Sequence, residues 1–177
     1  MLIDEFLPDY HFEERHSIRI RANAETVYAA AQDTDFSESR IVRGLLTLRG
    51  MSSTALSLRN LNYSKFRILG ERPAKEFLIG LAGRFWTPWA DLQDVNAENF
   101  REFNKEGYAK AVWNFSIEET PDGSDLRTET RIKCIGDSSR RCFGIYWTFV
   151  QPFSGWIRME MLKAIKRNAE LKATGSV

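Results

Sequence analysis

The chain has 177 residues, of which 43% are hydrophobic and 28% are charged. These proportions are typical of globular proteins, so they exclude a mainly disordered chain and predict one domain over residues 1–177. Lysine and arginine number 25 against 24 aspartates and glutamates, and the formal net charge of +1 gives no indication of a nucleic-acid partner. No apolar run approaches the roughly 20 residues that cross a bilayer, and the acidic start MLIDE lacks a signal-peptide core. We therefore expect a cytoplasmic protein without integral membrane association.

The first third of the chain predicts one strand followed by two short helices. Residues 10–22 form the strand, because side chains of different polarity alternate along its second half. Asn23 is a suitable cap for the helix that follows it. A second helix is predicted over residues 36–48, with Gly50 as its stop. Residues 52–64 give no clear prediction.

The middle of the chain predicts a run of antiparallel strands. Residues 66–71 and 75–85 form the first two, and the two glycines inside the second indicate a bulge or a bend. Residues 108–119 and 126–135 show the clearest alternation of polar and apolar side chains. The segment TPDGS between them is a strong hairpin-turn signal. A curved antiparallel sheet is therefore expected.

The last segment, residues 139–172, predicts a long helix capped by Asp137 or Ser138. Its first half is apolar nearly all round, whereas its second half is amphipathic. Pro152 with Gly155 should kink or interrupt the helix between the halves. The first half has more apolar surface than one contact with a sheet needs, so part of it is expected to face a ligand.

Three stretches carry a resemblance to a known superfamily. They are HSIRIRANAETVYAAAQDTDF, AKAVWNFSIEETPDGSDLRTETRI and SRRCFGIYWTFVQPFSGWIRMEMLKAIKRNAE. The pattern resembles the SRPBCC superfamily of helix-grip proteins, which includes START lipid-transfer domains, birch-pollen-allergen relatives and the polyketide cyclase/dehydrase group, and it is similar to a bacterial branch of unknown function. The resemblance covers nearly all of residues 10–171. It implies an α+β helix-grip fold, in which a curved antiparallel sheet wraps around the long C-terminal helix.

The resemblance also implies a cavity between the sheet and the terminal helix, with its mouth near residues 24–48. The candidate ligand-binding residues are Trp86, Trp89, Trp113, Phe115, Glu129, Arg131, Phe143, Tyr146 and Trp147. The aromatic side chains could line the pocket, with Trp86 and Trp89 at its entrance, or they could pack together as an ordinary core. Glu129 and Arg131 share one strand face and could pair inside the cavity, or they could form a solvent-facing ion pair. The sequence leaves open which face of residues 126–135 points inward.

Catalytic, metal and cofactor sites are not indicated. The two histidines, His11 and His16, lack metal-ligand spacing and no nucleophile motif accompanies them. Cys134 and Cys142 are too few for a disulfide framework and are expected to be buried free thiols. We therefore expect no catalytic residue, no metal and no cofactor.

The leading hypothesis is a binding protein that holds a lipid, isoprenoid, polyketide or aromatic metabolite between the sheet and the terminal helix. An alternative is a cyclase or dehydratase-type enzyme, which needs an inward-facing acid or base such as Glu129 or His16. A third hypothesis is a protein-interaction module with an exposed aromatic surface and no enclosed ligand. A homodimer is possible. The basic stripe of the last helix could contact acidic lipids or be a solvated face.

Overall fold

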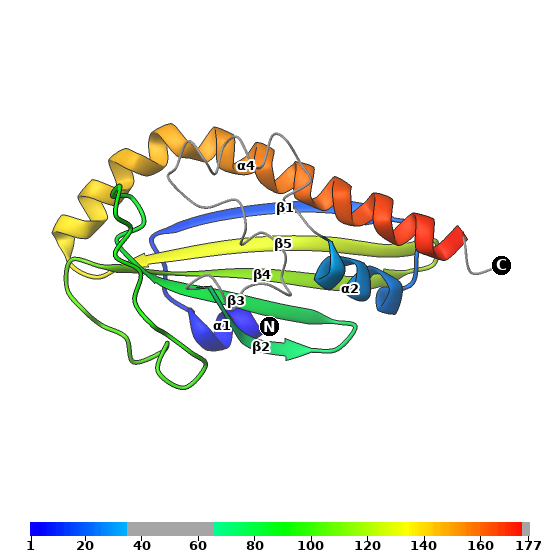
Figure 1. The fold of residues 1–177 in the computed structure, drawn as a ribbon, viewed down its shortest axis with the longest axis horizontal. Helices are drawn as coiled ribbons and strands as arrows, with labels where there is room; N and C mark the ends of the chain where they lie inside the picture. The colour runs from blue at the N-terminus through cyan, green and yellow to red at the C-terminus, as the bar shows by residue number, and fades with distance from the viewer. Residues whose placement is uncertain (35–65, 175–177) are drawn as a thin grey trace.

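The computed structural model describes residues 1–34 and 66–174, which form an α+β fold with a five-stranded antiparallel sheet and a long C-terminal helix (Figure 1). The elements in chain order are α1 (Leu2–Phe6), β1 (Phe12–Ile20), α2 (Ala24–Asp33), β2 (Arg67–Arg72), β3 (Glu76–Gly83), β4 (Ala109–Thr120), β5 (Gly123–Cys134) and α4 (Asp137–Thr174). The helix predicted over residues 36–48 and the segment 52–64 lie outside the described residues. The predicted fold class is confirmed, with the sheet wrapped along the last helix in a helix-grip arrangement.

The strands lie in the order β1-β5-β4-β3-β2, and each pairs antiparallel with its neighbour. The first strand therefore pairs with the last one. Residues opposite each other in this register share a face of the sheet. One such row runs from Glu14 through Thr130 and Trp113 to Ile79, and it faces α4.

Glycine within the predicted strand 75–85 allows a neighbouring side chain to pack closely against the backbone, and it does not mark a bulge of that strand. The register irregularity lies in the neighbouring strand, between Ile68 and Gly70. A Cβ atom on Gly80 would stand 2.3 Å from the Leu69 side chain, which is far inside van der Waals contact. The missing side chain at Gly80 therefore lets Leu69 fill the core.

The last helix, α4, runs for 38 residues along one face of the sheet. It continues through Pro152, and Figure 1 shows it arching over β1 and β5. A kink or an interruption was predicted at Pro152 and Gly155. The helix is not interrupted there, and it is curved in Figure 1. Proline removes one backbone donor and crowds the preceding turn, which favours bending when packing holds both halves.

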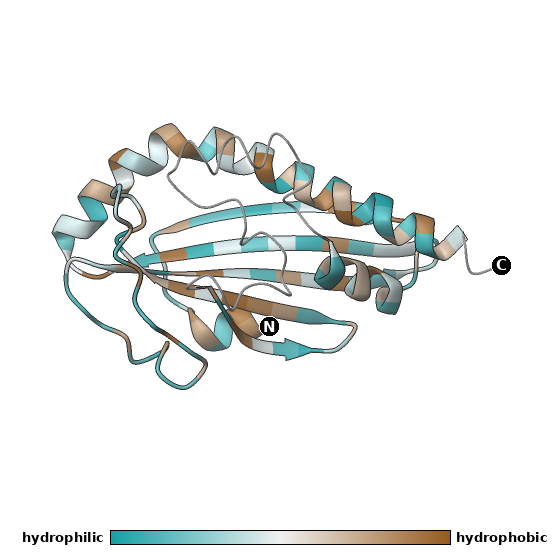
Figure 2. Ribbon diagram, viewed as in Figure 1, coloured by the Kyte–Doolittle hydropathy of each residue, from teal (hydrophilic) through white to brown (hydrophobic). Residues whose placement is uncertain are grey.

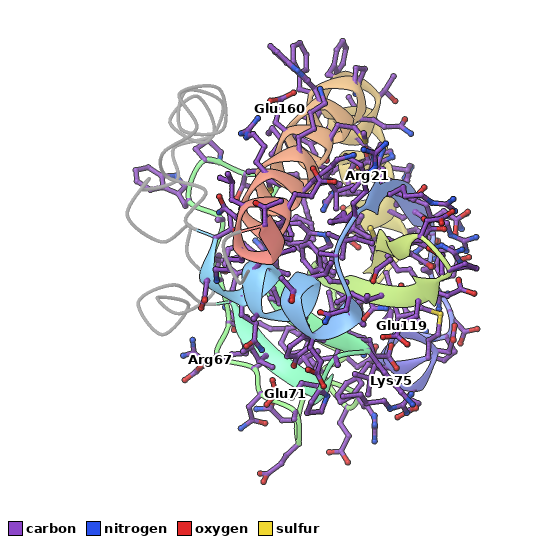
Figure 3. The ribbon with its side chains drawn as sticks, turned by 90° about the vertical axis from the view of Figure 1, so that its right-hand side faces the viewer. Arg21, Arg67, Glu71, Lys75, Glu119 and Glu160 are labelled. Carbon is purple, nitrogen blue, oxygen red and sulfur yellow. The ribbon has the colours of Figure 1, made fainter. Side chains whose placement is uncertain are left out.

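The larger core lies between α4, α2 and this face of the sheet. Asn23 caps α2 as predicted, since its side chain accepts a hydrogen bond from the Thr26 backbone N–H at 2.9 Å. Figure 3 shows α2 lying across the end of the sheet below α4. The fully buried members of this core are Ile20, Val27, Ala30, Ala31, Phe115, Leu126, Leu162, Ile165 and Ala169.

The opposite face of the sheet is covered by α1 and by residues 95–103. Ile3, Phe6 and Leu7 pack there against Leu78 and Phe100. The sequence does not predict α1, which lies before the expected core of residues 10–171. Both faces of β3 and β4 are therefore covered, whereas the outer face of β1 and β5 carries the exposed Arg15, Arg19 and Arg127. Among the described residues no helix is long and apolar enough to span a membrane.

Candidate functional site

A buried polar group lies in the middle of the interface between α4 and the sheet. Its centre is the carboxylate of Glu14 on β1, whose side chain is only 7% exposed. Glu14 Oε1 lies 2.9 Å from His16 Nε2, and Glu14 Oε2 accepts a hydrogen bond from Ser154 Oγ at 2.9 Å. Arg158 Nε donates to the same Oε2 at 3.3 Å. We call Glu14, His16, Ser154 and Arg158 the Glu14 cluster.

The helix reaches this carboxylate because of its local sequence. Ser154 and Arg158 are four residues apart, so both side chains lie on one side of α4. Gly155 between them has no side chain, and a Cβ atom there would stand 2.9 Å from Glu14 Oε1. Burying a carboxylate is costly unless it is paired and hydrogen-bonded. Ser154 and Arg158 supply that pairing from the helix.

Three residues of the central strands extend this polar group. The Arg158 guanidinium lies over the Trp113 ring, 4.7 Å from its centroid, and Trp113 Nε1 donates a hydrogen bond to Thr128 Oγ1. Thr130 stands in register between Glu14 and Trp113 on the same face. Its hydroxyl is buried and has no hydrogen-bond partner within the described part of the chain. A polar atom of a bound molecule could supply that partner.

An aromatic cluster adjoins the polar group beneath the first half of α4. Phe143 is buried at its centre, with the Phe12 ring 4.9 Å away, centroid to centroid. The rings of four further residues lie 5.5 to 5.8 Å from Phe143, and these are Phe85, Trp86, Tyr146 and Trp147. All five surrounding rings remain partly exposed. We call this set the Phe143 cluster.

Six of the predicted ligand-binding residues lie on the α4 side of the sheet. Trp86, Phe143, Tyr146 and Trp147 meet in the Phe143 cluster, and Trp113 contacts the Glu14 cluster. Phe115 lies deeper, fully buried. It stacks on Phe77 with centroids 4.7 Å apart, so it packs as core. Trp89, predicted at the entrance, is 90% exposed on the loop after β3.

Glu129 and Arg131 lie on the other face of the sheet. Arg131 Nε lies 2.7 Å from Glu129 Oε1, so the predicted pair forms, but Arg131 also contacts Asp4 Oδ1 at 2.9 Å and donates to the Leu7 carbonyl. Burial alone would raise the pKa of Asp4, but hydrogen bonds from Arg131 and the amino terminus hold that pKa below its ordinary value. These contacts fasten α1 to the sheet, away from the Glu14 cluster. The inward face of β5 carries Thr128 and Thr130 instead.

The two cysteines and His11 do not belong to the Glu14 cluster. Both thiols are free, but only Cys134 is buried; the prediction that Cys142 is buried is wrong, because it lies on the outer side of α4. His11 Nδ1 accepts a hydrogen bond from the Cys134 backbone N–H at 3.1 Å, and burial lowers the pKa of His11. Over residues 1–34 and 66–174, no three potential metal ligands group together.

Glu14, Ser154 and Arg158 were not predicted from the sequence as site residues. Glu14 has the same strand parity as His16, Ile18 and Ile20, so a signal for its inward direction was present. Its helical partners are separated from it by 140 and 144 residues. Nothing local in the sequence joins them.

No protein-family model matches the chain, and no curated protein matches it significantly. Solved structures to which the chain is similar include protein MLL2253 from Mesorhizobium loti, which is 15% identical and covers 88% of this chain and 98% of its own, with a TM-score of 0.42. Protein CV1439 from Chromobacterium violaceum is 13% identical over 89% and 97% of the two chains, with a TM-score of 0.42. Ara h 8.0201 is 8% identical over 89% and 97%, with a TM-score of 0.31. These values indicate no function, and the helix-grip description rests on the strand order and on the packing of α4.

Proposed function

We propose that the protein binds a small, mainly apolar molecule between α4 and the facing side of the sheet, with the Glu14 cluster orienting a polar part of that molecule. The observation that carries this proposal is the Thr130 hydroxyl. It is buried beside Glu14 and Trp113, and it has no partner among the described residues. A hydroxyl or carbonyl group of a ligand would satisfy it. The candidate ligands are lipids, isoprenoids, polyketides and aromatic metabolites.

The polar cluster supports recognition better than it supports stability. A buried ion pair can often be replaced by apolar side chains at little cost or with a gain in stability. An interface that only had to hold α4 would therefore gain little from Glu14 and Arg158. Fixed polar groups within an apolar surface are, in contrast, the usual means by which a site orients its ligand.

The aromatic side chains supply the driving force for binding. Trp113, Tyr146 and Trp147 face the interior and keep part of their surface exposed. Covering about 200 Å² of apolar ring surface contributes on the order of 5 kcal/mol, before the entropic cost of binding is subtracted. A free energy of 5 kcal/mol alone corresponds to a dissociation constant of only about 0.2 mM, so a ligand that is retained during purification also needs the polar contacts.

The first test is native mass spectrometry of protein purified from its own host, followed by extraction with organic solvent. We expect an apolar molecule with one polar group, in stoichiometric amount. Protein that carries no molecule, and that also fails to bind a panel of lipids and aromatic metabolites, would contradict the proposal.

A second candidate function is an enzyme of the cyclase or dehydratase type, favoured by the contact between His16 and Glu14. The 2.9 Å separation of His16 Nε2 and Glu14 Oε1 is suited to proton transfer, with the carboxylate orienting the ring. In a dehydration, His16 would take a proton from carbon and return it to the departing hydroxyl, releasing water and leaving a double bond.

The molecules extracted from the protein and from the His16→Gln variant distinguish the two functions. An enzyme predicts that the variant retains a precursor heavier by the mass of one water. The same molecule in both preparations would leave only the binding function.

A further inference from the structure

The outer side of α4 carries a row of exposed apolar side chains. Ile145 is 67% exposed, Phe149 72%, Phe153 53% and Trp156 50%. Their spacing of three or four residues places them on one side of the helix. We call these four residues the outer stripe.

The outer stripe lies opposite the side of α4 that packs on the sheet. Phe143, Trp147 and Ser154 point toward the sheet, where they join the two clusters described above. The sequence predicted that the surplus apolar surface of this helix would face a ligand, but a large part of it faces outward. Figure 2 shows apolar stretches along the arch of α4, and the arch presents its convex side to the exterior.

The same helix concentrates positive charge. The sequence of α4 contains seven basic and three acidic residues, in a chain whose net charge is +1. Two of the basic residues pair with other elements, Arg158 with Glu14 on the sheet side and Lys172 with Asp33 of α2. Exposed Arg141 precedes the outer stripe, and exposed Lys163 and Arg167 follow it. Glu160, which lies away from the sheet in Figure 3, pairs with Lys163 at 2.9 Å. The outer stripe is therefore bordered at both ends by cationic side chains.

We propose that the outer stripe docks α4 onto an anionic lipid surface. Tryptophan and phenylalanine on one side of a helix, with lysine and arginine around them, are the composition of helices that lie in a membrane interface. Anionic headgroups complement the exposed cationic side chains that border the stripe, Arg141, Lys163 and Arg167. This inference goes beyond the ligand-binding proposal and does not depend on it.

The experiment is flotation of the full chain with vesicles of phosphatidylcholine alone and with vesicles of equal parts phosphatidylcholine and phosphatidylglycerol. We expect binding to the anionic vesicles to be at least about tenfold tighter, because each basic residue near the surface adds roughly fivefold. High salt should remove most of this difference. Tryptophan emission should shift to shorter wavelength on binding, since Trp156 enters an apolar phase.

A double variant, Phe149→Ser with Trp156→Ser, tests the outer stripe itself. Both side chains are at least half exposed, so thermal unfolding should stay close to that of the unmodified protein, whereas vesicle binding should fall to the background level. The matched control is Leu171→Ser on the same helix, where the leucine is 70% exposed and lies beyond the stripe. This control should bind vesicles as the unmodified protein does.

Three outcomes would overturn the inference. The first is no binding to anionic vesicles at low salt. The second is unchanged binding by the double variant. The third is a concentration-dependent dimer, seen by light scattering, that the double variant abolishes while no vesicle binding occurs. In that case the outer stripe is a contact between two copies of the chain.

Discussion

At the scale of single residues, Glu14 is the side chain of the interface whose burial depends most on polar partners. It is buried with its charge satisfied by His16, Ser154 and Arg158, which come from β1 and from α4. Removing one partner leaves an uncompensated charge, and that is far more costly than removing the charge together with its partner. The cluster therefore fixes α4 at one point on the sheet.

The Arg158→Met variant should lower the free energy of unfolding by about 3–5 kcal/mol, because it leaves the Glu14 carboxylate buried without its cation. Adding Glu14→Gln should recover most of that loss. Urea unfolding of the two single variants and the double variant measures both effects. If the double variant lost as much free energy of unfolding as Arg158→Met, Arg158 would stabilise the protein by something other than its charge pair with Glu14.

Thr130 and Thr128 offer a matched pair of substitutions. Thr130→Val removes a hydroxyl without a partner among the described residues, so stability should stay within about 1 kcal/mol or rise, while ligand affinity falls about tenfold. Thr128→Val leaves the Trp113 indole N–H without its acceptor, so stability should fall by about 1–3 kcal/mol. Thermal unfolding and titration with the extracted ligand measure the two effects. An unchanged affinity in Thr130→Val would remove this hydroxyl from the site.

The two thiols should differ sharply in reactivity. Burial raises the pKa of Cys134 to about 12, and the thiolate is the reactive form. Near neutral pH an alkylating reagent should therefore modify the exposed Cys142 alone, and both thiols should react in urea. The ordinary pKa of a thiol, 9.0, applies in the unfolded chain, so the contribution of Cys134 to stability is fully present below pH 9 and is lost as the pH rises toward 12. Mass analysis after native labelling would contradict this assignment if Cys134 were modified.

At the scale of elements, the sequence predicted what is locally encoded. The alternation in β4 and β5, the turn between them, the Asn23 cap and the long last helix all follow from patterns within a few residues of each other. α1 could not be predicted, because a helix of five residues is not stable alone and forms here through the packing of Leu2, Ile3 and Phe6. The inward face of β5 could not be predicted either, because that face carries the polar Thr128 and Thr130, while Arg131 on the other face is buried under α1.

Two glycines of α4 show how packing overrides helix propensity. Alanine is better than glycine in a helix by about 1 kcal/mol. At Gly144 the added methyl group would meet only the Phe12 ring at 3.6 Å, so Gly144→Ala should raise stability by up to about 1 kcal/mol. At Gly155 it would meet Glu14 Oε1 at 2.9 Å, so Gly155→Ala should lower stability and disturb the Glu14 cluster. Urea unfolding distinguishes the two positions, and a gain at Gly155 would show that the helix is free to move away from the carboxylate.

At the scale of the whole molecule, the sheet separates two large cores, one on each of its faces. The first lies under α4 and α2, and the second lies under α1 and residues 95–103. The strands β3 and β4 contribute to both, because alternate side chains point to opposite faces: Ile79 and Phe115 belong to the first core, and Leu78 and Val112 belong to the second. Loss of either core should therefore destabilise the strands that hold the other, and the chain should unfold in a single transition.

The Ile3→Ala variant tests this coupling. Ile3 is fully buried on the α1 side, and its truncation should lower the free energy of unfolding by about 2–5 kcal/mol. Tryptophan fluorescence reports largely on the opposite side, where Trp113 and Trp147 lie. Its transition should move by the same amount as the circular dichroism signal. Separate transitions would mean that α1 unfolds independently.

The pairing of β1 with β5 also determines how late in synthesis the sheet can be completed. β1 is complete at Ile20, but its partner ends at Cys134, and α4 follows after that. The edge of β1 and the apolar side of the growing sheet must therefore wait for most of synthesis before they are covered. Unpaired edges and apolar surface are the features that lead to aggregation and that chaperones bind. The nascent chain is accordingly the form of this protein that depends most on chaperones.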